Sequence, residues 1–198
     1  MIKKEKILSL ITFLLVFTAI SAHYLYEPWG FYWKVSEKEA IKRMNLIATA
    51  EQWLGFQESD GSHTHILDIY NNHEPLAQSY IVQPEDSWCA AFVSAAAIEA
   101  GLADRIPTEC SCERQIGLWQ ELGQWEEDDN AVPLPGDLIY YNWDQKKPGE
   151  NSGWSDHVGI VVGTKWPFVK VIEGNYEDRV KYRILLLGDI HIRGYGKF

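Results

Sequence analysis

A cysteine, a histidine and a glutamate occur in an order and spacing that could support nucleophilic catalysis. Cys89 begins a run of small and apolar residues that predicts a helix over residues 88–100, His157 begins a predicted strand, and Glu173 ends the next one. A thiol reacts as the thiolate, and both the positive end of a helix and a nearby imidazole favour that anion. We therefore interpret Cys89 as a nucleophile, although a small cysteine of this kind is also typical of a protein core.

The histidine and the glutamate lie on two predicted strands joined by a short connection. Short connections imply antiparallel pairing, which places His157 and Glu173 near the same end of a sheet. There Glu173 could accept the imidazole N–H and leave the other ring nitrogen for the thiol. Each residue alone is also typical of a solvated strand end. Their joint placement with Cys89 predicts a base in His157 and an orienting carboxylate in Glu173.

Helices in the first half of the chain must position the cysteine. Ser36 and Glu39 have the spacing of a capping box, which predicts the start of an amphipathic helix that Gly55 ends. We expect its buried face to consist of Ile41, Met44, Ile47, Ala48 and Leu54. We expect residues 57–86 to be irregular. The helix over 88–100, with Asp86 or Ser87 as its N-cap, is apolar on nearly every side and is therefore predicted to be buried.

The second half of the chain changes to the pattern of strands. A third helix is predicted over 112–122 with Ser111 as its cap, and strands follow over 137–143, 157–163, 168–173, 180–186 and 190–195. The connections between these strands are rich in Gly, Asn and Asp and too short for helices. Helices followed by antiparallel strands predict a single α+β domain.

The N-terminus has the pattern of an exported protein. Three lysines within the first six residues precede an uncharged apolar run, which is typical of a signal peptide. The uncharged stretch extends to Tyr26, long enough for a membrane anchor, and aromatic residues follow it as they do at a membrane interface. We divide the chain into residues 1–26 as signal peptide or anchor, 27–35 as an aromatic linker and 36–198 as the catalytic domain.

The charge of the chain excludes some partners. The sequence has 18 basic and 28 acidic residues, a net charge of −10. Residues 1–22 contain three of the basic residues and one of the acidic ones, so the remainder has a net charge of −12. An acidic domain of this kind has no electrostatic reason to bind nucleic acid or to adhere to an anionic wall.

Four segments together resemble the CHAP family, a papain-like group within the NlpC-type amidase superfamily. They are residues 87–94 (SWCAAFVS), 135–141 (PGDLIYY), 156–161 (DHVGIV) and 171–175 (VIEGN), and the resemblance covers residues 40–198. It implies a papain-like fold with Cys89 as nucleophile, His157 as base, Glu173 as orienting group and Asn175 as a supporting polar group. It also implies an N-acetylmuramoyl-L-alanine amidase or endopeptidase that acts on peptidoglycan, which we expect to be a monomer at the outer face of the membrane or secreted to the wall.

The resemblance extends to further site residues. Papain-like enzymes have a glutamine six residues before the nucleophile, so Gln83 is a candidate oxyanion donor, although a loop glutamine in solvent fits equally well. Trp88, Trp143 and Trp154 are candidates to line a substrate groove. The acidic calcium loop of some relatives is absent before Cys89, so we expect no metal and no other cofactor.

The two remaining cysteines leave several possibilities open. Cys110 and Cys112 could join His63 and His65 in a zinc site, form a strained local disulfide, or stay as unpaired thiols near the cleft. The chain as a whole also has alternative functions. It could be a non-catalytic wall-binding or scaffold domain of the same fold, or a cysteine amidase that acts on an amide outside the wall. A domain that only binds would not need Cys89, His157 and Glu173 together.

Overall fold

The computed structural model of the protein describes residues 35–128, 130–147 and 153–198. The chain divides into two units, Met1–Gly30 and Phe31–Phe198, and all described residues belong to the second. The predicted signal peptide or anchor over 1–26, and all but the last residue of the linker over 27–35, lie outside the described residues. In the part of the chain that is described, no helix is both long enough and apolar enough to cross a bilayer.

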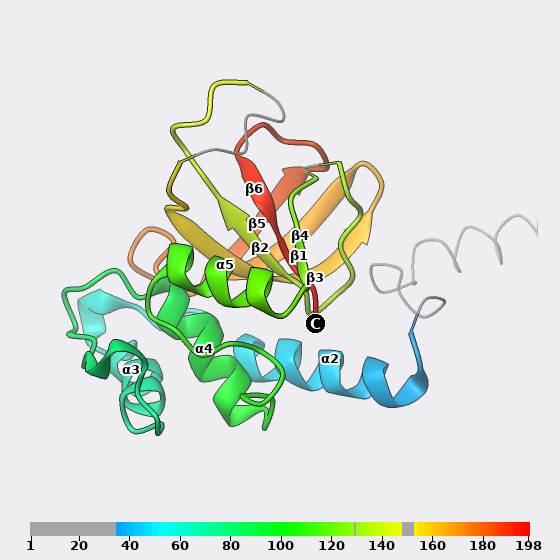
Figure 1. The fold of residues 1–198 in the computed structure, drawn as a ribbon. Coiled ribbons are helices and arrows are strands. Elements are labelled where there is room, and N and C mark those ends of the chain that lie inside the picture. Colours follow the sequence, from blue (N-terminus) through cyan, green and yellow to red (C-terminus); the bar gives the residue numbers. More distant parts are fainter. Residues whose placement is uncertain (1–34, 129, 148–152) are drawn as a thin grey trace, which may run out of the picture. The chain divides into compact units, whose positions relative to one another are not determined.

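The described residues form an α+β fold in which helices pack against an antiparallel sheet (Figure 1). The helices are α2 (Glu37–Glu51), α3 (Thr64–Asn71), α4 (Cys89–Glu99) and α5 (Cys112–Glu121), with short 3-10 helices at Glu58–Asp60 and Ala77–Ser79. The strands are β1 (Trp125–Glu126), β2 (Leu138–Tyr141), β3 (His157–Lys165), β4 (Phe168–Glu173), β5 (Lys181–Leu186) and β6 (Ile192–Gly196). They pair in the order β1-β6-β2-β3-β4-β5, and every pair is antiparallel. The predicted α+β class with an antiparallel sheet is confirmed for the described residues, and β1 is a strand that the sequence did not predict.

Strand β2 is buried on both faces of the sheet, which explains why it is apolar at every position. Leu138 and Tyr140 of β2 pack in the main core between the sheet and the helices. Ile139 and Tyr141 alternate with them and pack in a second core on the other face. Because all four residues of β2 are buried, the strand could be recognised only as a continuous apolar run.

Helix α2 begins where the sequence predicted but buries a different face. The Ser36 side chain accepts a hydrogen bond from the Glu39 N–H, as expected of an N-cap. However, Ile41, Met44, Ala48 and Leu54 are exposed, and only Ile47 of the predicted face is buried. The observed buried residues of the helix are Ala40, Arg43, Leu46, Ile47 and Ala50.

An ion pair explains why that face is buried. Arg43 donates from Nη1 to Asp137 Oδ1 at 2.7 Å and to the Pro135 carbonyl at 3.0 Å, and both charged side chains are almost completely buried. Asp137 lies directly before β2, 94 residues further along the chain. This long-range pair fixes the rotation of α2 against the sheet, which local apolar periodicity could not indicate.

Two further predictions about the helices were wrong. Residues 57–86 are not irregular throughout, because Thr64–Asn71 form α3 and bury Ile66, Leu67 and Tyr70. In addition, neither Asp86 nor Ser87 caps α4. Trp88 occupies the N-cap position without a side-chain cap, because Asp86 instead accepts hydrogen bonds from the Gln83 N–H and the Tyr80 hydroxyl.

Helix α5 begins as predicted and is tied to the sheet by a buried hydrogen-bond chain. The Ser111 side chain accepts from the Arg114 N–H and caps the helix. Trp119 Nε1 donates to the Tyr140 hydroxyl at 2.8 Å, and that hydroxyl donates to Gln115 Oε1 at 2.8 Å. These bonds hold the helix, including its first residue Cys112, at a defined position over β2.

Candidate active site

The structure places Cys89 at the first residue of α4, in a largely buried position. Its exposed fraction is 5%, and residues 89–97 of the helix are all buried, as the all-round apolar pattern predicted. The first N–H groups of a helix have no partner within the helix and give its N-terminus a partial positive charge. The Cys89 sulfur therefore lies where a thiolate is electrostatically favoured.

A second thiol and the predicted base surround the Cys89 sulfur. Cys112 Sγ lies 3.6 Å from Cys89 Sγ. The hydrogen bond from the Cys112 thiol has the largest effect on the pKa of Cys89 and lowers it, whereas burial raises it. A hydrogen bond and the charge of His157 lower this pKa further, and so does a hydrogen bond from the Val158 N–H. The result is a pKa of Cys89 well below the usual value of a thiol. For Cys112, the hydrogen bond with Cys89 and burial raise the pKa well above the usual value of a thiol.

His157 and Glu173 meet at one end of the sheet, as antiparallel pairing predicted. His157 Nε2 lies 3.0 Å from Glu173 Oε2, which leaves Nδ1 of the ring for the thiol. The ring stacks on Tyr141, its partner across β2 and β3, at 5.8 Å between centroids. Burial disfavours the charged ring, but hydrogen bonds and charge attraction from Cys89 and Glu173 outweigh it and raise the pKa of His157 to about 10. The arrangement favours a thiolate and an imidazolium over two neutral groups.

Sequence reasoning missed Arg183, which is the second partner of Glu173. Arg183 Nε lies 2.9 Å from each Glu173 oxygen, and the carboxylate has no exposed surface. The guanidinium lies over the rings of Tyr176 at 3.7 Å and Trp143 at 5.0 Å. In the β4–β5 register Arg183 pairs with Val171, so it shares a face with Glu173 two residues along. This alternation is the sequence signal that could have found it.

Two glycines provide the space that the site needs. A Cβ on Gly174 would lie 2.5 Å from Phe92 Cβ and 2.8 Å from the Trp88 ring, so only glycine lets the end of β4 approach α4 this closely. A Cβ on Gly159 would lie 2.7 Å from Glu173 Cγ. These contacts explain why glycine follows Glu173, and why glycine stands two residues after His157.

The three tryptophans predicted to line a groove occupy different environments. Trp88 is fully buried and donates from Nε1 to Glu58 Oε1 at 3.0 Å, so it does not line a groove in this structure. Trp143 is 39% exposed and stacks on Tyr141, with its ring 6.5 Å from that of His157. Trp154 is 74% exposed. Trp143 therefore lies beside His157, and Trp154 stays a candidate from the sequence.

The two polar candidates of the site are not joined to its central residues. The Gln83 side chain is exposed and donates to the Ile81 carbonyl at 2.9 Å. Asn175 has a left-handed backbone conformation, with φ 58°, just after Glu173. Among the described residues its half-buried side chain makes no hydrogen bond to His157 or Glu173. The roles of both residues stay predictions.

The zinc site considered from the sequence is not assembled. In the described part of the chain, which includes His63, His65, Cys110 and Cys112, no three His, Cys, Asp or Glu side chains are grouped as metal ligands. All three cysteines are free, so the local disulfide is also not formed. Cys110 lies beside Glu109, whereas Cys112 faces the nucleophile.

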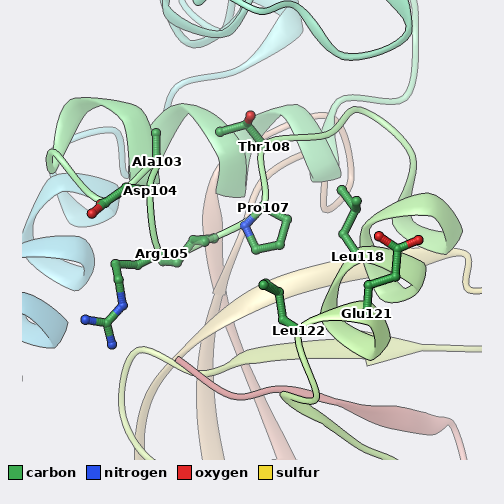
Figure 2. Close-up of a pocket in the computed structure, with 9 residues that line it drawn as sticks. Ala103, Asp104, Arg105, Pro107, Thr108, Leu118, Glu121 and Leu122 are labelled. Atoms are coloured by element: carbon green, nitrogen blue, oxygen red, sulfur yellow. The ribbon is translucent and has the colours of Figure 1, made fainter.

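A surface hollow elsewhere on the domain lacks the groups needed for this chemistry. It is formed by the segment after α4 and the end of α5 (Figure 2). Its polar side chains include Arg105, Asp104 and Glu121, but none of the cysteines or histidines lines it. We therefore take Cys89 and its neighbours, and not this hollow, as the candidate active site.

Comparison with known proteins agrees with the resemblance seen in the sequence. The family model of the CHAP domain matches residues 79–175, a segment that begins before α4 and ends just after β4. Cys89, His157, Glu173 and Asn175 all lie within it. A search of curated proteins found no match to the chain. Together with the fold and the arrangement of the thiol, imidazole and carboxylate, the family match shows that the chain contains a CHAP domain.

Proposed function

We propose that this protein hydrolyses amide bonds in the stem peptides of peptidoglycan, as an N-acetylmuramoyl-L-alanine amidase or an endopeptidase. The proposal rests mainly on one arrangement, in which Cys89 interacts with His157 and His157 interacts with Glu173. It combines a thiol of lowered pKa with an imidazole held by a buried carboxylate 3.0 Å away. This combination is what attack on an amide by a cysteine requires.

The proposed reaction uses each of these groups in turn. The Cys89 thiolate attacks the carbonyl carbon, and the Cys89 N–H at the start of α4 stabilises the oxyanion. Gln83 is the second donor that we propose from the sequence, and it would have to release the Ile81 carbonyl to reach the oxyanion. The His157 imidazolium protonates the leaving amine, and the neutral ring then activates the water that releases the acyl group from Cys89.

Arg183 acts through Glu173 in this proposal. A buried carboxylate without a cationic partner tends to take up a proton, which would end its attraction for the imidazolium. Arg183 Nε, 2.9 Å from both oxygens of Glu173, supplies that cationic partner. Arg183 is therefore a positioning residue, and Glu173 orients His157 and supports its positive charge.

Digestion of purified peptidoglycan tests the proposal. The full-length chain should release soluble fragments, and mass analysis of the new ends distinguishes an amidase from an endopeptidase. Cys89→Ser should release none while it stays folded, and Cys110→Ala is the matched control because Cys110 faces Glu109 and not the nucleophile. If wild type and Cys89→Ser leave the wall equally intact, the domain binds the wall without cutting it or acts on another amide. If both digest it equally, the cysteine mechanism is wrong.

We also propose that the domain works outside the cytoplasm as a monomer. The lysines and the apolar run at the N-terminus support export, and the acidic net charge makes retention by an anionic wall unfavourable. A membrane anchor would instead keep the enzyme at high local concentration beside its wall. Fractionation of cells with N-terminal sequencing of the mature chain decides between anchor and secreted protein. A soluble chain that begins near residue 22 would exclude the anchor.

A further inference from the structure

The thiol of Cys112 is in contact with the nucleophile, although the proposed reaction does not require it to form any bond. The two sulfur atoms are 3.6 Å apart, and both residues are more than nine-tenths buried. Each cysteine is the first residue of its helix, α4 or α5, so two helix N-termini meet at the sulfur pair. Both ends favour negative charge on sulfur.

Buried hydrogen bonds tie the two helices to the segment that precedes α5. The Ser94 hydroxyl on α4 donates to the Glu109 carbonyl at 2.8 Å and accepts from the Glu109 N–H at 2.9 Å. Gln115 Nε2 on α5 donates to the Pro107 carbonyl at 2.6 Å. Residues 107–109, three to five positions before Cys112, are thus fixed to both helices. The contact between the two thiols is therefore part of the packed core and does not depend on an exposed loop.

We propose that Cys89 and Cys112 form a redox modification site, in which a hydroperoxide oxidises the nucleophile and Cys112 closes a reversible disulfide with it. This inference rests on the reactive thiolate of the proposed function. The product has no nucleophile and is inactive. It also protects Cys89 from further oxidation to the sulfinic acid, which thiols do not reverse.

The chemistry balances in two steps. The Cys89 thiolate attacks one oxygen of the hydroperoxide, the O–O bond breaks, and Cys89 becomes a sulfenic acid while the leaving oxyanion takes a proton from the His157 imidazolium. The Cys112 sulfur then attacks the Cys89 sulfur, the S–O bond breaks, and the hydroxyl leaves as water with the proton of the Cys112 thiol. Two thiols lose two electrons, and the hydroperoxide is reduced to an alcohol or to water.

The environments of the two thiols determine which one reacts with the hydroperoxide and which one forms the disulfide with it. Cys89, whose pKa is lowered, is the thiol that reacts with the peroxide. Its negative charge contributes to the raised pKa of Cys112, and that contribution disappears once Cys89 is a neutral sulfenic acid. Cys110 is unsuited to be the partner, because its sulfur contacts Glu109 and the Gln78 amide.

Peptide mass mapping of the full-length chain tests the site without any wall substrate. The reduced protein is treated with hydrogen peroxide under native conditions, free thiols are alkylated, and the chain is cut at arginine and lysine. Because no basic residue separates Cys110 from Cys112, the experiment uses Cys110→Ala alongside wild type to identify the partner. We expect the loss of two hydrogen atoms, a link between the Cys89 and Cys112 peptides, and full reversal by dithiothreitol.

Two variants of Cys112 make the test decisive. At the same peroxide dose, Cys112→Ala and the nearly isosteric Cys112→Ser should accumulate Cys89 with two added oxygen atoms, which dithiothreitol does not remove. The proposal is overturned if wild-type Cys89 gains oxygen while Cys112 is still alkylated, or if Cys110 is the linked residue. Failure to digest peptidoglycan would contradict the proposed function and leave this result unchanged, since the readout is mass alone.

Discussion

Arg183→Gln is the substitution that most directly tests how the site holds its charge. The change removes the cation whose Nε lies 2.9 Å from each Glu173 oxygen. Glu173 has no exposed surface, so water cannot simply replace the guanidinium. Either the carboxylate stays charged at a cost in stability, or it takes up a proton and stops supporting the His157 imidazolium.

The structure sets the size of the expected effect. Removal of one partner of a buried ion pair typically costs about 3–5 kcal/mol, and the lower end applies because the Arg183 side chain is 19% exposed. If Glu173 is neutralised instead, His157 loses one charge-assisted hydrogen bond worth about 1.5–3 kcal/mol. A loss of that size should lower the ratio of the thiolate–imidazolium pair to the neutral pair about tenfold or more, and should therefore lower the thiolate population of Cys89 at pH 6.

The rate of alkylation of Cys89 by iodoacetamide, followed by mass, measures that population across the pH range. Urea denaturation measures the free energy of unfolding of the same variants. Arg179→Gln is the matched control, because this nearby arginine is exposed, pairs through its backbone with Gln57, and donates from its side chain to the Glu177 carbonyl and not to Glu173. Arg183→Lys should fall between wild type and Arg183→Gln, and Glu173→Gln should slow alkylation in the same way. Unchanged alkylation and unchanged stability in Arg183→Gln would refute the role assigned to Arg183.

The remaining predictions concern the thiol of Cys89, the close approach of β4 to α4 at Gly174, and the buried ion pair between Arg43 of α2 and Asp137. Because the pKa of Cys89 is held well below its usual value and that of His157 is raised to about 10, alkylation at pH 6 should stay near its rate at pH 8, whereas an ordinary thiol slows about 100-fold. Amide hydrolysis should fall as the pH rises through about 10, where His157 loses the proton that it donates. Gly174→Ala should cost about 1–3 kcal/mol in urea denaturation, since its Cβ overlaps Phe92, and Gly117→Ala, with open space around it, should cost nothing. Arg43→Met should cost about 3–5 kcal/mol by the same measurement, because it leaves Asp137 buried without its cation.

The parts of the fold that could be predicted from the sequence have local patterns. The strands of the second half are short and separated by turn residues, and all five predicted strands lie within two residues of their predicted bounds at both ends. Helix α4 is apolar all round and could only be buried. The pairing of His157 with Glu173 follows from the short β3–β4 connection, which fixes both residues at one end of the sheet.

The parts that sequence reasoning missed depend on partners far along the chain. The buried face of α2 is decided by Asp137 and not by Ile41 and Met44, which have the right spacing but face outward. Trp88 was expected near substrate, yet it fills the space between α4 and the Glu58 carboxylate. Gln83 has the spacing of a papain-like donor, but spacing alone does not determine which way a loop side chain points.

The contact between Cys112 and Cys89 gives one residue two separable effects. In the reduced protein the Cys112 thiol donates to the Cys89 sulfur and is the largest cause of its lowered pKa, so it favours the reactive anion. The same proximity allows the disulfide. A hydroxyl at position 112 could still donate a hydrogen bond to the thiolate, but it cannot form a disulfide, whereas a methyl group can do neither. Cys112→Ser should therefore retain more Cys89 alkylation at pH 6 than Cys112→Ala, while both lose the recovery from peroxide that dithiothreitol provides. Equal alkylation rates in the two variants would show that the hydrogen bond contributes nothing to the reactivity of Cys89, and that the contact matters only for oxidation.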